Sequence, residues 1–471
     1  MKRLMDWILE FNQLVNDFVW GLPMLVLLIG AGILLAVRTR FAIYRNFKVV
    51  MKETFGSLFG KQEVEEGTIT PFQAVSTAMA ASVGTGNIAG VALAISVGGP
   101  GAILWMWLAA ILGMTTKFAE VTLSVATRQK NDVGEWVGGP MYYIKNGLNN
   151  KWLSKIFALF AMLAPLGVGS MVQANSMSEV LNNTFSIPTW VTGIVLLVSA
   201  GLVILGGISR ISSFAEKIVP AMAGLYVLGG LVILFIQRDQ IPAAIQMIFS
   251  NAFTGTAATG GFLGATVQMA VRHGISRGVF TNEAGLGSGP IAHAPANTDH
   301  PVRQGLWGAF EVFIDTIVVC SLTALVIITS GVWKNGDLAG ASMTTAAFES
   351  GFTGGGYIVT IGLVLFAFTT VIGWYYYGEK AFGFLMQTTK FTNLYRIVYI
   401  ACLFIGSVGG LSVIWGIADT LNGLMAIPNL IALFALSGMV ARLSSDFFKD
   451  PSHIRSKETD WLSFKEKSTE K

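Results

Sequence analysis

A short polar stretch interrupts an otherwise apolar run of this chain, and its residue types could bind both an anion and a cation. The stretch is Ser82-Val83-Gly84-Thr85-Gly86-Asn87, within the small-residue, apolar segment 76–128. A helix of roughly 20 apolar residues would cross a bilayer unbroken, whereas two glycines and three hydrogen-bonding side chains predict that the backbone opens. An opened backbone persists at membrane depth only where it lines a protein-enclosed or watery cavity. We therefore expect a solute or ion site here.

Each side of this predicted break suits a different charge. The amide N–H groups of Thr85 and Gly86 begin the resumed helix, at the positive end of its dipole, and suit a carboxylate. Gly86 has no side chain, which lets a ligand approach the backbone closely. The carbonyls from Ala80 to Val83 face the other way and suit a small cation. The side chain of Asn87 could add an oxygen or an amide.

Four positions elsewhere in the chain could complete such a site. Thr369 and Thr370 place hydroxyls in the apolar segment 355–387, but such hydroxyls more often bond to a helix carbonyl than to a ligand. They matter only if they face the break. Trp374 shares a helical face with Thr370 and could cap a small pocket, the alternative being a packing or interfacial tryptophan. Gln173 is a further polar contact or, alternatively, a cross-helix hydrogen-bonding residue.

Composition and apolar runs define the elements that must position these residues. The chain has 471 residues, of which 53% are hydrophobic and only 12% are charged, whereas soluble proteins carry about 25% charged residues. Long apolar runs separated by short charged loops predict one polytopic, all-α membrane protein. Eleven runs are long enough to span a bilayer. They are 20–37, 70–95, 101–127, 152–181, 189–208, 214–236, 243–273, 304–332, 355–387, 394–411 and 413–441.

The distribution of lysine and arginine predicts the orientation. A cytoplasmic C-terminus places most of the 31 Lys and Arg residues on the cytoplasmic side, including Arg272, Arg277 and Arg303. We therefore expect a multi-pass protein of the cell inner (plasma) membrane, with its N-terminus outside and its C-terminus in the cytoplasm. The first residues lack the features of a cleaved signal peptide.

Two glycine-rich interruptions suggest an internal repeat. The break at 82–87 lies in the first of the ten segments that follow the N-terminal one, and a second glycine-rich stretch, Gly255–Gly264, lies in the sixth. Interruptions at matching places in two halves are typical of an inverted repeat with a site at the interface. Alternatively, these glycines only let helices pack closely. The expected organisation is an N-terminal helix and loop (1–69), two five-helix halves (70–236 and 237–441) and a cytoplasmic tail (442–471).

Five ionisable residues are predicted to lie within the membrane, where charge is costly and indicates function: Lys117, Glu120, Glu311, Asp315 and Asp419. Lys117 and Glu120 are three residues apart on one helix and are expected to neutralise each other. Glu311, near the cytoplasmic end of its segment, is expected to be solvated. Asp315 and Asp419 are the candidates for a proton site or a gate. None of the five lies in either break, so carbonyls and hydroxyls would have to meet the ammonium of a zwitterion.

Enzymatic functions find little support in the sequence. Gly84, Gly86 and Gly90 have the wrong spacing for a dinucleotide loop, and no parallel strand precedes them. The four histidines fall in or beside predicted cytoplasmic segments and form no metal-ligand pair on a helix face. No nucleophile elbow is present, and Cys320 and Cys402 predict neither a disulfide framework nor a metal site. We expect no enzyme, no cofactor and no nucleic-acid partner.

Three motifs resemble those of a known family. GGPGAILWMWLAAILG at Gly98–Gly113, SVGTGNIAGV before it and GVFTNEAGLGSGP at Gly278–Pro290 resemble the alanine or glycine:cation symporters, the bacterial sodium:alanine symporters. Leu104 stands where that pattern usually has Phe. Gly84–Asn87 is also similar to the unwound first helix of the neurotransmitter:sodium symporters. The resemblance implies a ten-helix, five-plus-five inverted-repeat transporter fold with broken first and sixth core helices and one extra N-terminal transmembrane helix.

The resemblance also implies a function and the residues that perform it. The function would be sodium-coupled symport of a small neutral amino acid, alanine or glycine, into the cell by alternating access. The implied substrate-binding residues are Thr85, Gly86, Asn87, Gln173, Phe262, Thr370 and Trp374. The implied sodium ligands are the carbonyls of Ala80 and Val83 with Thr369 and Thr370. Thr281, Asn282 and Glu283 would order a gate in a cytoplasmic loop.

Two rival functions remain open. A proton-coupled transporter for small amino acids would use Asp315 or Asp419 as its titrating group. An intramembrane enzyme or a passive channel belongs to another class. A channel would conduct without saturable, mutually dependent binding of substrate and ion, whereas an enzyme would convert alanine chemically.

Overall fold

The computed structural model describes residues 2–56, 65, 67–254, 267–334, 336, 338–409, 412–453 and 461–463. Within these ranges the regular secondary structure is helical, apart from an isolated bridge and one antiparallel hairpin of β1 (Gln129–Lys130) and β2 (Trp136–Val137). The α-helices are α1 (Lys2–Val19), α2 (Leu22–Arg38), α3 (Ala42–Arg45), α4 (Phe47–Glu53), α5 (Pro71–Ser82), α6 (Val91–Gly98), α7 (Ala102–Thr127), α8 (Pro140–Tyr142), α9 (Lys151–Ala164), α10 (Val172–Phe185), α11 (Thr189–Ile204), α12 (Gly207–Ile236), α13 (Ile241–Thr254), α14 (Val267–Asn282), α15 (Pro290–His293), α16 (Pro301–Val312), α17 (Ser321–Ser330), α18 (Gly340–Gly351), α19 (Gly355–Met386), α20 (Thr392–Val408) and α21 (Ser412–Lys449). Short π-helical segments continue or join them: η2 (Gly86–Gly90), η3 (Tyr143–Gly147), η4 (Pro165–Met171) and η7 (Phe313–Cys320). Two 3-10 helices, η5 (Arg238–Gln240) and η8 (Val332–Lys334), do the same.

The described helices match the predicted membrane spans closely. Seven helices, counted with the turns that continue them, are long and apolar enough to cross a membrane, and the bent pair Pro71–Ser82 and Gly86–Gly98 makes an eighth. Two further apolar helices, α11 and α20, are shorter. Ten of the eleven predicted spans therefore coincide with apolar helices, and the eleventh, 243–273, contains residues outside the described ranges.

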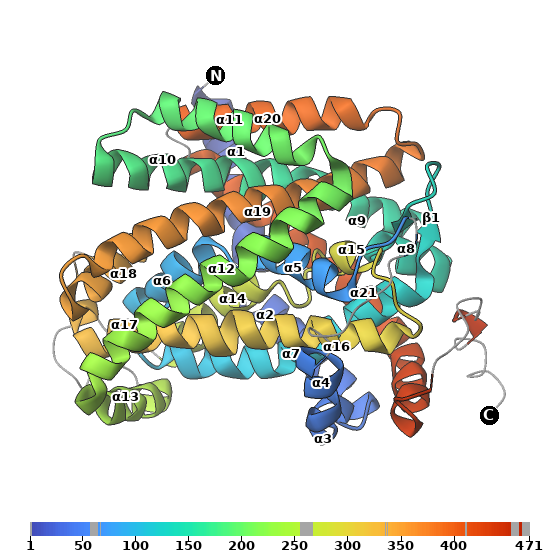
Figure 1. Cartoon of the computed structure of the whole chain (residues 1–471), viewed down its shortest axis with the longest axis horizontal. Helices are drawn as coiled ribbons and strands as arrows, with labels where there is room; N and C mark the ends of the chain where they lie inside the picture. Colours follow the sequence, from blue (N-terminus) through green and yellow to red (C-terminus); the bar gives the residue numbers. More distant parts are fainter. Residues whose placement is uncertain are drawn as a thin grey trace.

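Most of the long helices run along the long axis of the molecule (Figure 1). α13 and α18 lie at one end, which we call the α18 end. The β1–β2 hairpin, α8 and the C-terminus lie at the other, which we call the hairpin end. The site described below lies between these ends.

α5 begins where its sequence predicts a helix start. Thr70 and Gln73 form a capping box, with Gln73 N–H donating to Thr70 Oγ1 and Thr70 N–H donating to Gln73 Oε1, both at 3.0 Å. Pro71 occupies the first helical turn, where its missing N–H costs nothing. This cap satisfies donors that a helix terminus otherwise leaves unpaired. It fixes the start of the helix that carries the predicted break.

Glycines on α16 let α16 and α7 pack closely. A Cβ on Gly305 would lie 2.2 Å from Thr122 Oγ1, and one on Gly308 would lie 2.8 Å from Val121 Cγ2. Neither position therefore has room for a larger residue. Small residues at such contacts let membrane helices approach closely where lipid supplies no hydrophobic driving force. α14 packs against the same helix, α7, and so the α7 framework supports the second half of the site.

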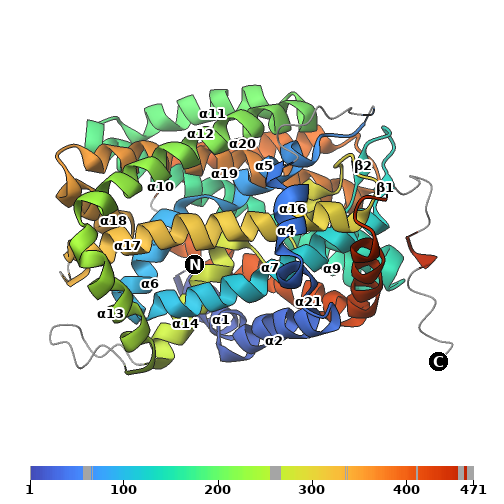
Figure 2. The same ribbon diagram turned by 60° about the horizontal axis from the view of Figure 1, so that its bottom comes forward.

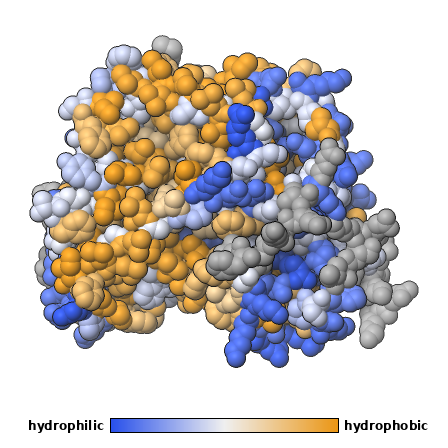
Figure 3. All heavy atoms as spheres, viewed as in Figure 1, coloured by the Kyte–Doolittle hydropathy of each residue, from blue (hydrophilic) through white to orange (hydrophobic). Residues whose placement is uncertain are grey.

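Apolar side chains cover much of the surface between the two ends, whereas hydrophilic ones gather toward the hairpin end (Figure 3). Helices α11, α12 and α20 and their ends contribute side chains that are more than half exposed: Leu202, Leu205, Leu228, Phe235 and Ile397. A monomer in water rarely exposes so large an apolar surface. The surface fits a lipid environment, as the composition predicted.

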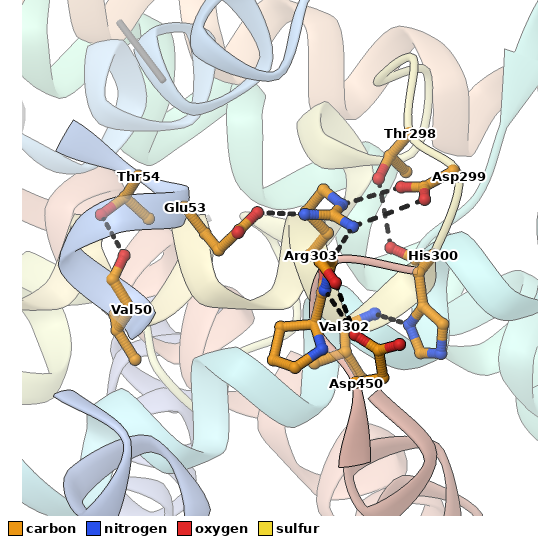
Figure 4. A network of polar contacts seen from close by, with 11 residues as sticks. Val50, Glu53, Thr54, Thr298, Asp299, His300, Val302, Arg303 and Asp450 are labelled. Carbon is orange, nitrogen blue, oxygen red and sulfur yellow. Dashed lines mark hydrogen bonds and ion pairs between the residues drawn. The ribbon is translucent and has the colours of Figure 1, made fainter. Parts of the chain in front are cut away.

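At the hairpin end, Arg303 joins three parts of the chain (Figure 4). Its guanidinium pairs with Glu53 of α4, and it donates to Asp299 Oδ1 at 2.8 Å and to the Pro451 carbonyl at 3.0 Å. Hydrogen bonds between ionised groups are stronger than neutral ones. α4 and the segment after α21 are thereby held against the start of α16.

The N-terminal helices α1 and α2 pack against α21 (Figure 2). Asn16 of α1 donates to Asp419 Oδ2 at 3.3 Å, and Trp20 Nε1 donates to the Asp419 carbonyl at 3.2 Å. Asp419, one of the two candidates for a proton site or a gate, therefore bonds to the N-terminal helix.

The β1–β2 hairpin is tied to α19, the helix that carries Thr370 and Trp374. Lys380 Nζ on α19 donates to Glu135 Oε2 at 2.8 Å. Partial burial by itself would raise the pKa of Glu135, but the Lys380 ammonium outweighs it and lowers that pKa below its usual value. The pair is therefore charged at neutral pH.

Candidate functional site

The backbone opens between α5 and η2, as the sequence predicts. α5 ends at Ser82, and the half-helix that follows is bent from it by 53°. The Gly84 N–H donates to Asn87 Oδ1 at 2.9 Å, and the Asn87 N–H donates to Gly84 O at 3.2 Å. In a continuous α-helix these two donors would bond to Ala80 O and Val83 O. Those two carbonyls are therefore released for another partner.

A second interruption lies opposite the first, at residues 283–289 between α14 and α15. Gly285 and Gly287 adopt φ values of 94° and 84° there, a conformation that glycine reaches without steric cost. A Cβ on Gly86 would lie 2.7 Å from Thr281 Cγ2, so the first break touches the end of α14, which leads into the second interruption. The predicted second break, 255–264, lies outside the described residues, and the interruption seen lies further along the chain.

The expectation that Thr281, Asn282 and Glu283 lie in a cytoplasmic gate loop is wrong. Their exposed fractions are 1%, 0% and 2%. α14 carries them into the core, where Thr281 and Glu283 line the same cavity as the first break. The glycines and polar residues of this motif are typical of a loop, but here they build a buried turn between two helices.

A small cavity of about 20 Å³ lies between the two interruptions. It brings together five of the predicted substrate-binding residues: Thr85, Gly86, Gln173, Thr370 and Trp374. Its wall also contains eight residues that the sequence analysis did not assign to the pocket: Ala81, Ser82, Gly84, Val168, Phe280, Thr281, Glu283 and Asn422. A water molecule needs about 10–15 Å³ on a comparable measure. The space suits only a small ligand.

Five other predicted residues are not among the described residues of this wall: Ala80, Val83, Asn87, Thr369 and Phe262. Asn87 lies behind the break, where its side chain bonds to Gly84 and Asp315. Thr369 Oγ1 donates to the Phe366 carbonyl at 3.0 Å and lies 3.5 Å from Met222 Sδ. Phe262 lies outside the described residues.

Thr370 does face the break. A Cβ on Gly84 would lie 2.6 Å from Thr370 Oγ1, and the Thr370 hydroxyl donates its proton to the Phe366 carbonyl at 2.8 Å. Its lone pairs stay available. Ser82 Oγ is buried on the same wall and has no hydrogen-bond partner in the part of the chain that the structure describes. Hydroxyl and carbonyl oxygens are the ligands that small hard cations prefer.

Asp315 contacts the first break, although the sequence placed no ionisable residue there. Asn87 Nδ2 donates to Asp315 Oδ1 at 2.7 Å, and the Thr316 hydroxyl donates to Asp315 Oδ2 at 2.7 Å. All three residues are fully buried. Because Asn87 also accepts from Gly84, the carboxylate and the opened backbone are linked through one side chain. Only the fold could reveal this link, since 228 residues separate Asn87 and Asp315.

The expected neutralisation of Lys117 by Glu120 is wrong, as is the expected solvation of Glu311. Lys117 Nζ pairs instead with Glu311 Oε1 at 3.2 Å, and both side chains have zero exposure. His293 Nε2, predicted to lie in a cytoplasmic segment, lies 3.1 Å from Glu311 Oε2. Glu120 Oε1 accepts from the Gly285 N–H at 3.0 Å and from Asn429 Nδ2 at 2.6 Å. Glu120 therefore bonds to the second interruption and does not form an ion pair with Lys117.

A larger cavity of about 690 Å³ opens toward the α18 end. It shares Thr85, Gly86 and Phe280 with the small cavity, so the Phe280 side chain lies at the junction of the two. Arg277 also lines it, and its guanidinium lies 5.5 Å from the Phe280 ring. The prediction that Arg277 lies on the same side as Arg303 is therefore wrong, because Arg303 is at the hairpin end. The larger cavity offers a route from the α18 end to the first break.

Comparison with known proteins identifies the family. The profile of the sodium:alanine symporter family matches residues 5–460. The chain belongs to this family. The symporter is 48% identical over 450 residues to the sodium/alanine symporter AgcS of Methanococcus maripaludis, covering 94% of this chain and 98% of the relative. It is 46% identical over 438 residues to a transporter of Haemophilus influenzae, covering 92% of this chain and 95% of that one.

The fold agrees with that of solved transporters. The crystal structure of MhsT in complex with L-phenylalanine matches the symporter with a TM-score of 0.57 at 14% identity, over 85% of this chain and 95% of that one. At this identity the likeness shows the fold alone. The symporter is thus a helical, multi-pass membrane transporter with this transporter fold, and it is not an enzyme.

Proposed function

We propose that the symporter couples the entry of sodium to the uptake of a small neutral amino acid, alanine or glycine. The observation that supports this most directly is the small cavity between two interrupted helices, which combines opened backbone with buried side-chain oxygens. Broken half-helices facing one another are the usual construction of a substrate and ion site in secondary transporters.

In this proposal the substrate carboxylate binds to the amide N–H groups of Thr85 and Gly86. These are the first donors of the resumed helix, and a helix leaves its first donors without intrahelical partners. The helix dipole adds a positive field at the same place. Trp374 closes the pocket against larger side chains, since it is buried and lines the small cavity.

The sodium ion is placed beside α5. The released carbonyls of Ala80 and Val83 and the Thr370 hydroxyl supply neutral oxygens there, with Thr369 as the less direct member of the predicted set. Because the ion and the substrate both need the same opened backbone, each stabilises the binding of the other. One positive charge moving through 100 mV yields about 2.3 kcal/mol. A tenfold sodium gradient adds about 1.4 kcal/mol, and the sum supports accumulation of roughly several hundredfold.

We further propose the two five-helix halves 70–236 and 237–441 as an inverted repeat, with the N-terminus outside and the C-terminus in the cytoplasm. The basic residues near the hairpin end support this orientation. The larger cavity would then open to the outside. Uptake into the cell would begin from this cavity, past Phe280.

A proton-coupled transporter of the same fold is the second candidate. The observation that favours it is the buried Asp315 carboxylate, which bonds to Asn87 of the first break. In that case a proton on Asp315 would take the place of sodium in coupling.

Uptake of labelled alanine into proteoliposomes of the purified symporter tests both candidates. With an inward sodium gradient at fixed pH we expect saturable accumulation, which replacement of sodium by choline abolishes. Unchanged uptake in choline would overturn sodium coupling. Accumulation driven by an inward proton gradient in choline would establish the second candidate instead.

A further inference from the structure

The small cavity contains more hydrogen-bond acceptors than the proposed function has used. Gln173 Oε1 and Asn422 Oδ1 are buried, line this cavity and have no hydrogen-bond partner within the described ranges. Glu283 adds a buried carboxylate, of which one oxygen accepts from the Ser288 hydroxyl. A buried polar atom without a partner is costly. A ligand with several donors would satisfy these atoms together.

Glu283 also has an unusual backbone. It directly follows Asn282, the last residue of α14; its N–H donates to the Val279 carbonyl at 2.8 Å, and its φ is 58°. Glycine or asparagine usually occupies this left-handed position at a helix end. Residues other than glycine that hold this backbone conformation in a buried position are found most often at functional sites. The side chain therefore has a role that glycine could not fill.

Glu283 forms no ion pair with any residue that the structure describes. The nearby lysine, Lys117, forms its ion pair with Glu311 instead. The carbonyls at the C-terminal end of α14 add to the negative potential. This part of the cavity is thus arranged for a cation with several hydrogen-bond donors.

We propose that Glu283, with the amide oxygens of Gln173 and Asn422, binds the ammonium group of the substrate. The assignment rests on the proposed function, because it completes the recognition of a zwitterion whose carboxylate binds at Thr85 and Gly86. The three donors of an ammonium match these three acceptors. It replaces the expectation that carbonyls and hydroxyls alone meet the ammonium. It also makes Glu283 and Asn422 specificity-determining residues, selecting amino acids over hydroxy acids.

The test compares alanine with lactate, which carries a hydroxyl in place of the ammonium. Both are measured as competitors of labelled alanine binding to the purified symporter in sodium. Loss of one charge-assisted hydrogen bond weakens binding by roughly 10- to 100-fold. We expect Glu283→Gln to lose about this much affinity for alanine while lactate changes little, so that the preference for alanine over lactate collapses. Glu283→Asp should keep most of the preference for alanine over lactate.

Two further variants separate binding from a structural role. Glu283→Gln retains an oxygen for the Ser288 hydroxyl, whereas Ser288→Ala removes that bond and keeps the charge. If Ser288→Ala reproduces the collapse, Glu283 acts through the turn and the proposal is wrong. Addition of Asn422→Asp to Glu283→Gln returns a carboxylate to the same cavity from α21 and should recover alanine selectivity. A failure to recover it would contradict the placement of Asn422 against the ammonium.

The outcomes are distinct from those that test the proposed function. Glu10→Gln, an exposed position on α1, is the control for loss of a carboxylate elsewhere. If the unaltered symporter does not bind alanine in sodium, the proposed function fails. If it binds alanine and Glu283→Gln has the same preference over lactate, the ammonium assignment alone fails.

Discussion

The side-chain amide of Asn87 bonds across the first break in both directions: it accepts from the Gly84 N–H at 2.9 Å and donates to Asp315 Oδ1 at 2.7 Å. The opened backbone of one helix and a buried carboxylate on another are thus held by a single residue. The donor that would have closed the helix onto Ala80 is kept occupied. Asn87 therefore stabilises the open form of the break.

Replacing Asp315 tests this link. Asp315→Asn keeps the shape of the side chain but weakens the acceptor that faces Asn87 Nδ2. A buried hydrogen bond to a charged group contributes about 1.5–3 kcal/mol, so we expect lower thermal stability and uptake reduced by at least about tenfold. Asp419→Asn, which alters a carboxylate bonded to α1, is the matched control and should affect uptake less. Equal uptake in Asp315→Asn and the unaltered protein would show that the link is dispensable.

The contact of Gly86 with Thr281 gives a second prediction. Gly86→Ala would place a Cβ 2.7 Å from Thr281 Cγ2, and overpacking of this kind costs about 1–3 kcal/mol. We expect alanine uptake to fall by roughly 10- to 100-fold. Gly90→Ala is the control on the same half-helix, because nothing lies within 4 Å of its added Cβ.

The same contact can be relieved from the other side. Thr281→Ser removes the Cγ2 methyl that a Cβ on Gly86 would meet. The double variant Gly86→Ala with Thr281→Ser should recover a large part of the uptake lost by the single variant. If it recovers none, the steric contact is not the cause of the loss.

The two adjacent threonines of α19 should differ in their effect on sodium. Thr370 faces the first break, whereas Thr369 faces Met222. Thr370→Val should therefore raise the sodium concentration for half-maximal uptake more than Thr369→Val, by about tenfold for loss of one ligand worth roughly 1.4 kcal/mol. Uptake measured over a sodium titration at saturating alanine decides this. Unaltered sodium dependence in both variants would place the ion elsewhere.

Trp374 should control the size of the substrate. Trp374→Phe enlarges the small cavity, and a methylene group in an apolar pocket changes discrimination by about 1–3 kcal/mol. We expect valine and leucine to become effective competitors of labelled alanine, with a smaller loss of alanine affinity. Discrimination between glycine and alanine should stay modest in both forms. A pocket that still excludes leucine would show that another residue sets the size limit.

The pair Lys117–Glu311 should matter for stability. Removal of one partner of a buried ion pair typically costs about 3–5 kcal/mol, because the remaining charge is left unpaired. Lys117→Met should therefore lower the unfolding temperature in detergent strongly, and Lys117→Met combined with Glu311→Gln should lower it less. An additive loss in the double variant would show that the two charges do not compensate each other.

The sequence predicted the first break well because its signals are local. Two glycines and three polar side chains within six residues of an apolar segment disfavour an unbroken helix, and Thr370 and Trp374 follow from spacing on one helix. The second interruption was missed at Glu283–Gly289, because a buried turn and a solvated loop use the same residue types. Pairings such as Asn87 with Asp315 depend on the packing of distant helices, which hydropathy does not describe. The predicted pairing of Lys117 with Glu120 was wrong for the same reason. The two residues are close in sequence, but the packing of α16 brings Glu311 to Lys117 instead.

The close fit of α16 on α7 limits how this protein can change shape. The backbone of α16 at Gly305 and Gly308 lies directly against α7. The two helices therefore cannot slide past each other without a steric clash. We therefore expect α7 and α16 to move as one unit in any change of conformation. Switching access from one side of the membrane to the other would then leave the Lys117–Glu311 pair intact, since it joins α7 to α16.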